Sequence, residues 1–408
     1  MVLPMLRLSV SFICLVLSVT VSLADTGADH LRALRKAAGE NDPEAQYSLA
    51  MEILSYCRLT KEQQNEAIGW LRAAADRSDG RQPTAQAQLK LGKFYHAGIY
   101  TGKDVDEALR WYRRAADNLV VEAMLQLAEA YMVWSGTQRP DPAESIRWLQ
   151  RAANLGSAEA ANKLGMIYVN GQDAYGRVVP QDYAEARKWF LRAAPAMLAK
   201  SCAPYGQVPP VRGNCRPAEY LGTLFAKGLG TPQDFDSARS WFEAASRNYS
   251  PYSDYSLGGM HERGQGVPAD ISKALAYYRA AADNALPAAQ YRLGLAYLSG
   301  DGVEADSAEA LKWLALALGQ KAGSFVPAGS YGRNLAQSAD KDRGPFDFGG
   351  GLSTVAYDDA VAKVIELSKS LDPRELVRAD ASRQAFGMGF LQRRRILHPP
   401  PARCRPQP

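Results

Sequence analysis

Apolar residues recur along this chain in two alternating segments, and the pair of segments is repeated seven times. In the first segment an alanine, a leucine and an aromatic residue stand four positions apart, as in Ala289, Leu293 and Tyr297. Residues at this spacing lie on one face of a helix. In the second segment a large aromatic residue such as Trp313 is flanked by small ones. Both segments are therefore predicted to be amphipathic helices whose aromatic residues belong to the core.

The leucine of the first segment and the aromatic residue of the second mark each copy. The marker leucines are Leu49, Leu91, Leu127, Leu164, Leu221, Leu257 and Leu293. The marker aromatic residues are Trp70, Trp111, Trp148, Trp189, Trp241, Tyr277 and Trp313. The offset between the two markers is nearly constant, and variation falls in the joints and in one loop. This regularity predicts stacked helix pairs, because one pair alone cannot bury its apolar stripe.

Capping residues flank the predicted helices. Glycines such as Gly264 and Gly300 follow first helices and are expected to end them in a left-handed conformation. Gly294, beside a marker leucine, is expected to let the second helix approach closely. Six second helices begin after an aspartate, and four have a glutamate three residues later, the spacing of a capping box. The aspartates are Asp104, Asp141, Asp182, Asp234, Asp270 and Asp306.

These motifs resemble the Sel1-like repeat (SLR) family, a longer-looped relative of the tetratricopeptide repeat. The resemblance rests on Leu293-Gly294-x-x-Tyr297, Gly300-x-Gly302-Val303 and Ala310-x-x-Trp313-x-x-x-Ala317, with echoes upstream. It implies an all-α fold, a right-handed α/α solenoid of about seven tetratricopeptide-like helix pairs with C-terminal capping helices. Such solenoids usually bind other proteins, so the resemblance also implies a protein-binding function.

The segments outside the repeats have compositions of their own. Residues 1–24 carry Arg7, an apolar run and Ser22-Leu23-Ala24, which together predict a signal peptide and a periplasmic or secreted protein. The alternative is an uncleaved anchor. Residues 25–42 form a lead-in. The repeats span 43–317 and contain an insertion at 195–216. Then follow a Gly-rich linker (318–357), capping helices (358–386) and a basic, Pro-rich, disordered tail (387–408).

Charge and motifs narrow the function. The formal net charge is +5, and much of it lies in five tail arginines, so the remainder is close to neutral and no nucleic-acid partner is expected. The tail either touches anionic surfaces or has no role. His261-Glu262 starts a His-Glu-x-x-His motif but does not complete it, and the Ser-x-x-Lys match at Ser338-Ala339-Asp340-Lys341 lacks its partner motifs. We expect no cofactor, no metal site and a non-enzymatic, protein-binding scaffold or regulator of the bacterial envelope. The alternative is an envelope hydrolase, for example a penicillin-interacting one, with an unrecognised site.

A binding face is predicted on the first helices, opposite their marker leucines. Positions −2, +2 and +5 from the leucine lie there, since each residue turns the helix by about 100°. They hold few charges and many large apolar residues, among which Tyr255 and Tyr291 are candidate anchors for a peptide. The predicted binding face consists of Leu89, Leu125, Met132, Met166, Val169, Tyr255, Tyr291, Leu295 and Leu298. The alternative is that curvature of the array buries these residues against adjacent helices.

Four cysteines follow the predicted signal peptide. Cys202 and Cys215 bracket the proline-rich insertion, whereas a pairing of Cys57 with Cys404 stays open. Export into an oxidising compartment favours disulfides over free thiols. We therefore predict a disulfide between Cys202 and Cys215.

Peptide mapping of the exported protein without reduction checks this pairing. We expect one linked peptide that contains Cys202 and Cys215 and that separates after reduction. Recovery of both cysteines as alkylated free thiols would contradict the prediction.

Overall fold

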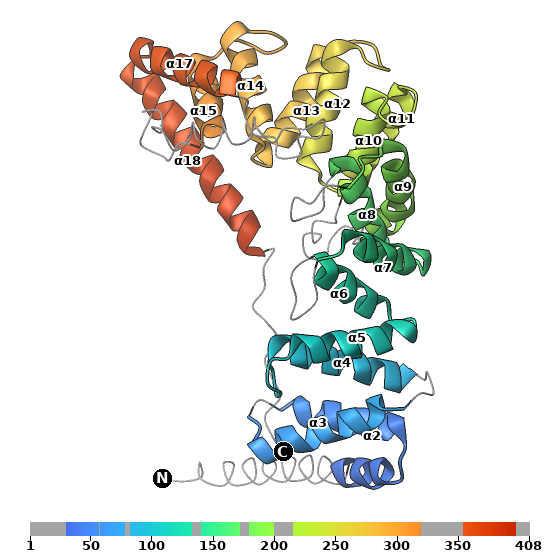
Figure 1. Cartoon of the computed structure of the whole chain (residues 1–408). Coiled ribbons are helices and arrows are strands. Elements are labelled where there is room, and N and C mark those ends of the chain that lie inside the picture. Colours follow the sequence, from blue (N-terminus) through green and yellow to red (C-terminus); the bar gives the residue numbers. More distant parts are fainter. Residues whose placement is uncertain are drawn as a thin grey trace, which may run out of the picture. The chain divides into compact units, whose positions relative to one another are not determined.

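The structure is a computed structural model in which the regular elements of the described residues are helices (Figure 1). It describes residues 30–56, 58–77, 82–132, 140–171, 179–199, 215–319 and 354–396. The predicted all-α fold is confirmed. The predicted signal peptide and most of the predicted linker lie outside these ranges. The chain divides after Ser157 into two compact units, which are described one at a time.

The first unit contains three helix hairpins, preceded by a helix over residues 30–39. We call the first helix of a hairpin the A helix and the second the B helix. The hairpins are formed by α2 (Pro43–Leu54) and α3 (Lys61–Ala75), α4 (Gln82–Ala97) and α5 (Val105–Asp117), and α6 (Val121–Met132) and α7 (Pro142–Asn154).

The second unit contains four hairpins and two further helices. The hairpins are α8 (Ala158–Asn170) and α9 (Tyr183–Ala199), α10 (Arg216–Lys227) and α11 (Phe235–Ser246), α12 (Pro251–Arg263) and α13 (Ile271–Asp283), and α14 (Pro287–Ser299) and α15 (Ser307–Ala317). The further helices are α17 (Thr354–Ser370) and α18 (Pro373–Ile396). The seven hairpins are the seven predicted helix pairs.

Close approach of the two helices defines the core of each hairpin. Every marker leucine is at most 2% exposed. The residue after it is glycine in five copies, and it faces a bulky side chain of the B helix. A Cβ atom added to Gly222 would lie 2.5 Å from Cε1 of Phe242, and one added to Gly294 would lie 2.6 Å from Cγ of Leu314. The close approach predicted at Gly294 is therefore confirmed.

The most deeply buried large residue of each B helix is the one that follows the marker aromatic residue. These residues are at most 3% exposed: Leu71, Tyr112, Leu149, Phe190, Phe242, Tyr278 and Leu314. The prediction that the marker stripe itself forms the core holds for Trp111, Trp189 and Trp313. It is wrong for the other four markers, which are half-buried. One residue turns a helix by about 100°, so the marker faces the neighbouring repeat instead, as Trp241 does when it packs against the cluster that includes Phe190 and Ala194 of the fourth repeat.

Aspartate caps start the B helices as predicted, but the reciprocal half of the capping box differs. The backbone N–H of Glu107 donates to Oδ1 of Asp104 at 2.9 Å. The N–H of Asp104 itself donates to the carbonyl oxygen of Tyr95 in the A helix at 3.0 Å. The Glu107 side chain therefore has no N–H to accept from, and it pairs with Arg110. The same bond from the capping aspartate to the A helix closes the six hairpins from α4 to α15.

Polar contacts between neighbouring repeats add specificity to the joints. Two residues after the marker, Arg113 donates to the hydroxyl of Tyr131 in the next A helix at 2.8 Å. Arg279 makes the same contact with Tyr297 at 2.5 Å. Charge-assisted hydrogen bonds of this kind are stronger than neutral ones. They fix how each hairpin stacks on the next within a unit.

A buried glutamine three residues before the marker leucine satisfies the end of the preceding B helix. The amide of Gln88 donates to the carbonyl oxygen of Ala75 at 3.0 Å, and that of Gln290 donates to Ala282 at 3.3 Å. The sixth repeat has Asp254 at this position, where it accepts a hydrogen bond from Ser246 at 2.5 Å. Burial raises the pKa of the Asp254 carboxyl. An ionised carboxylate cannot donate to helix-end carbonyls, and it meets the negative end of the helix dipole.

The predicted C-terminal capping helices exist, with wider bounds than expected. Asp372 caps α18, and Oε2 of Glu375 accepts from the Asp372 N–H at 3.4 Å, which completes a capping box. Helix α18 continues to Ile396, beyond the predicted start of a disordered tail at residue 387. That stretch contains no proline before position 399, so nothing in it terminates a helix. Helix α9 likewise continues through Pro195 into the predicted insertion, with this proline exposed in the last turns.

Truncation of Phe242 and of its neighbour Trp241 tests the assignment of the core. Phe242→Ala should lower the free energy of unfolding by about 3–5 kcal/mol, because it leaves a cavity against Gly222. Trp241→Ala should cost clearly less, since its side chain is only half-buried. Chemical denaturation of both variants measures the two values. Equal losses would mean that the marker tryptophan is the core residue.

Replacement of Asp254 by the glutamine found in other repeats should stabilise the protein. Asp254→Gln removes a buried charge and restores an amide donor, which should raise the free energy of unfolding at pH 7 by about 1 kcal/mol. A carboxyl whose pKa is raised by folding contributes most stability below its unfolded pKa of about 3.9 and loses it as the pH rises. The advantage of the variant should therefore shrink towards pH 4. An equal advantage at pH 4 and pH 7 would contradict this account.

Candidate protein-binding face

The predicted binding face divides into buried and accessible members. Leu89, Met132 and Val169 are buried, as the burial alternative expected. Leu298 is 37% exposed. The others are half-buried: Leu125, Met166, Tyr255, Tyr291 and Leu295. Most of this face therefore keeps some accessible surface, and its two units differ in what lies on it.

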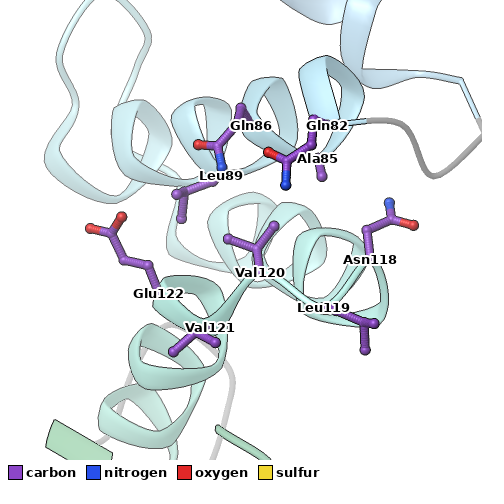
Figure 2. A pocket seen from close by; sticks show the side chains of 9 residues that line it. All are labelled: Gln82, Ala85, Gln86, Leu89, Asn118, Leu119, Val120, Val121 and Glu122. Carbon is purple, nitrogen blue, oxygen red and sulfur yellow. The ribbon is translucent and has the colours of Figure 1, made fainter. Parts of the chain in front are cut away.

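In the first unit a pocket of about 480 Å³ lies on the predicted binding face (Figure 2). This volume is within the range of about 300–1,000 Å³ that is common for ligand sites. The α4 helix supplies one wall, and the turn that leads into α6 supplies the other. The lining residues are Gln82, Ala85, Gln86, Leu89, Asn118, Leu119, Val120, Val121 and Glu122.

Helical phase explains why these residues meet. Gln82, Gln86 and Leu89 lie between about 160° and 220° from the marker leucine of α4, because each residue turns the helix by about 100°. Glu122 has the same phase in α6. The residues that face the pocket are therefore those that the inward-facing leucines direct away from the hairpin core. Of the predicted face, the pocket includes Leu89.

An uncommon backbone conformation exposes an apolar side chain at the mouth of the pocket. Leu119 has a φ of 60°, in the left-handed region that favours glycine. Its side chain is 59% exposed. At the corresponding turn of the next repeat the chain has Gly156, with a φ of 90°. The turns of other joints share this conformation, at Asn41, Tyr249 and Ala285, so it belongs to the joint between repeats. A non-glycine residue in it costs on the order of 1–3 kcal/mol.

Some polar groups of the pocket have hydrogen-bond partners within the protein and others have none. The amide of Asn118 donates to Oε1 of Gln88 at 2.9 Å. Lys93 donates to Oε1 of Glu122 at 2.5 Å, and both of these side chains are more than a third exposed. Among the described residues, the carboxamides of Gln82 and Gln86 have no hydrogen-bond partner. These two amides are therefore available to a ligand.

In the second unit the corresponding face is occupied by internal contacts. The hydroxyl of Tyr278 donates to Oε2 of Glu262 at 2.7 Å, and Arg292 contacts Oε1 at 3.3 Å. The ring of Tyr255 lies 5.3 Å from that of Tyr278. Burial and the nearby Glu262 carboxylate raise the pKa of Tyr278. Both possible anchors in this unit are half-buried, and Tyr255 is part of a polar network.

Helix α17 contacts the other candidate anchor. The hydroxyl of Tyr291 donates to Oδ2 of Asp359 at 2.6 Å, and Lys363 contacts Oδ1 at 2.9 Å. Burial and the Asp359 carboxylate raise the pKa of Tyr291 to about 12. The capping helix thus satisfies the polar end of Tyr291.

Two polar residues near the predicted face are buried at the joint of the fifth and sixth repeats. Glu219 is 8% exposed, and its Oε1 accepts from Ser250 at 2.5 Å. Burial raises the pKa of its carboxyl. Cys215 lies nearby as a buried thiol, 3.5 Å from the carbonyl oxygen of Asn248. Cys202 lies outside the described residues, so its disulfide with Cys215 stays a prediction.

Sequence reasoning did not identify the turn at Asn118–Val121 or the two glutamines of α4. The signal was present, since an apolar Leu-Val-Val run occupies a turn position that is glycine in the following copy. No described helix is long and apolar enough to cross a bilayer. The described residues also contain no cluster of three or more histidine, cysteine, aspartate or glutamate side chains placed to hold a metal ion.

Comparison with known proteins connects this architecture to one repeat family. The family model described as "Sel1 repeat" matches residues 43–79, 85–118, 121–157, 158–194, 218–250, 251–286 and 287–320. Each matched range contains one of the seven hairpins. This match supports a role of the chain as a repeat scaffold for protein–protein interaction.

Curated relatives share the repeats over part of their length. The chain is 29% identical over 222 residues to the chitin synthase regulator SKT5 of Saccharomyces cerevisiae. The aligned region covers 53% of this chain and 29% of the yeast protein. The chain is 26% identical over 212 residues to an uncharacterised protein of Neisseria meningitidis, covering 52% and 38% of the two chains. The chain therefore spans about a third of the length of these relatives.

Two solved structures share the fold. A Sel1 repeat protein of Oxalobacter formigenes superimposes with a TM-score of 0.59 at 23% identity, covering 89% of this chain and 91% of that one. A protective antigen of uropathogenic Escherichia coli with an SLR fold gives 0.57 at 23% identity, covering 90% and 71%. At these identities the likeness establishes the fold.

Replacement of Leu119 by glycine should stabilise the protein. Leu119→Gly relieves the left-handed strain, which outweighs the extra freedom of glycine in the unfolded chain, so the free energy of unfolding should rise by about 0.5–1 kcal/mol. Denaturant titration measures this change. Tyr249→Gly is the matched control, because Tyr249 has a φ of 62° at the same turn position of the fifth repeat. A clear loss of stability at Leu119 would show that its side chain is part of the core.

Proposed function

The chain belongs to the Sel1 repeat family, and from this premise we propose that it is a non-enzymatic scaffold that binds a partner protein on the face of its A helices opposite the marker leucines. The observation that carries the proposal is the pocket on that face, which is lined by two carboxamides without a partner among the described residues and by an exposed apolar side chain. Concave sites that combine apolar side chains with a few polar groups favour ligand binding. The pocket is therefore typical of an interaction site.

The names of the yeast relatives support a regulatory form of this scaffold. Relatives in Saccharomyces cerevisiae and Schizosaccharomyces pombe are named as a regulator and a regulatory factor of chitin synthase. We propose by analogy that this chain regulates another protein by binding it, without chemistry of its own. The partner is proposed to be a component of the bacterial envelope, because residues 1–24 are predicted to direct export. Sequencing of the mature N-terminus should then begin at Asp25.

Site-specific photo-crosslinking tests the binding face directly. A photoreactive p-benzoylphenylalanine is placed at Gln86, within the pocket, in the full chain expressed in its own cells. We expect a defined adduct that mass spectrometry identifies as one protein. The matched control carries the same group at Arg110, whose side chain is 63% exposed on α5, outside the pocket.

The two positions separate specific binding from random contact. Adducts at Gln86 and none at Arg110 support the proposed face. Equal labelling at both positions, or co-purification of a partner that labels only at Arg110, would place the interaction elsewhere and overturn the proposal.

A further inference from the structure

We propose that the pocket between α4 and α6 binds an extended segment of the partner, with an apolar side chain in the pocket and a basic residue two positions later beside Glu122. This inference rests on the proposed binding function and deepens it. It follows from the spacing of the free amides, the apolar lining and the position of the single formal charge among the nine lining residues.

The two free carboxamides have the spacing of an extended main chain. Gln82 and Gln86 are separated by four residues of α4, a rise of about 6 Å along the helix. Two residues of an extended chain advance by about 6.4–6.8 Å, so peptide groups that face the same side recur at nearly this distance. A carboxamide offers both a donor and an acceptor, and it can therefore pair with the N–H and C=O of one residue, which face the same side of an extended chain. Gln82 and Gln86 match two alternate residues of such a segment.

The turn residues provide an apolar site beside those amides. Leu89 is buried at the base of the pocket, and Val120 and Val121 are half-buried beside it. Leu119 projects at the mouth from a conformation that disfavours leucine. A ligand side chain of the size of leucine would cover these groups and remove Leu119 from water. Apolar burial of this kind yields roughly 25 cal/mol per Å².

Charge selects the residue that follows. Glu122 is the only charged residue among the nine that line the pocket. Lys93 contacts its Oε1, whereas Oε2 has no hydrogen-bond partner among the described residues. Both side chains of the Lys93–Glu122 ion pair are exposed to solvent. Because exposed ion pairs are weak, Lys93 holds the carboxylate only loosely. A cationic side chain can bind Oε2 of this carboxylate while Lys93 holds the other oxygen.

Side chains that are two residues apart in an extended chain lie on the same face. A leucine that enters the pocket therefore directs the second residue after it towards the same wall, at the start of α6 where Glu122 lies (Figure 2). The intervening residue points away from the pocket and is free to vary. The recognised pattern is thus apolar, any residue, basic, in an extended conformation.

Fluorescence anisotropy with the full chain tests this pattern. The probe is a fluorescein-labelled dodecapeptide of glycine and serine with Leu-Ser-Lys at its centre. We expect the affinity to fall at least about tenfold when the central leucine is alanine, and again when the lysine is glutamate, which corresponds to about 1.4 kcal/mol for each change. Equal binding of the three peptides would overturn the proposal.

Variants of the protein distinguish an effect on peptide binding from an effect on the stability of the fold. Leu119→Gly should weaken binding of the Leu-Ser-Lys peptide about tenfold without lowering the melting temperature, whereas Tyr249→Gly should leave binding unchanged. Because the Leu119→Gly chain is expected to be at least as stable as the original, unfolding cannot explain a loss of binding. Unchanged binding by Leu119→Gly would remove the pocket mouth from the site.

A double-mutant cycle tests the amide pairing. N-methylation of alternate peptide units should weaken binding to the original chain several-fold, and it should have no further effect on the Gln82→Ala, Gln86→Ala double variant. Equal effects on both chains would refute main-chain recognition. Failure of the peptides together with specific crosslinking at Gln86 would leave the proposed function standing and exclude only the extended segment. Peptide binding without crosslinking at Gln86 would support recognition of the extended segment and contradict the proposed binding of a partner protein at this face.

Discussion

The whole architecture depends on how closely the two helices of each hairpin approach one another. At Gly222 and Gly294 a single added methyl group would overlap the B helix, so the A helix can lie at this distance only where its residue after the marker leucine is small. The contact fixes the rotation of the A helix about its own axis. Once the leucine and glycine face inward, the residues half a turn away must face outward. The binding face is therefore a geometric consequence of the hairpin core.

Polar contacts join neighbouring repeats in addition to the apolar clusters. Arg113 reaches Tyr131 across one joint, and Gln88 reaches the carbonyl oxygen of Ala75 across another. Such bonds satisfy helix-end groups that would otherwise be buried without a partner. They also fix the stacking of each repeat with side chains that point away from the A-helix face. Neighbours are thereby held in place while the face in the first unit remains accessible.

Local signals in the sequence were sufficient for most of the fold, and tertiary contacts account for what they missed. Asp104 was identifiable as a cap because an N-cap interacts with its own helix turn. The loss of the second half of its capping box could not be predicted, because the Asp104 N–H bonds to Tyr95 in another helix. The deep position at Phe242 was readable, since a large apolar residue follows the marker in every copy. The pocket could not be predicted from the sequence, because it requires the left-handed turn at Leu119 to lie beside Gln86.

The two units show why equivalent positions on one face need not contribute equally to binding. Tyr255, Tyr278 and Glu262 form a network with Arg292 whose polar groups already have partners, and α17 satisfies Tyr291. A ligand at those positions would have to break existing internal bonds and leave their partners unsatisfied, which costs free energy. At Gln86 and Leu119 a ligand forms bonds and buries surface with nothing to displace but water. Interfaces concentrate their binding energy in a few such positions, so the pocket in the first unit is where this face has most to gain from a partner.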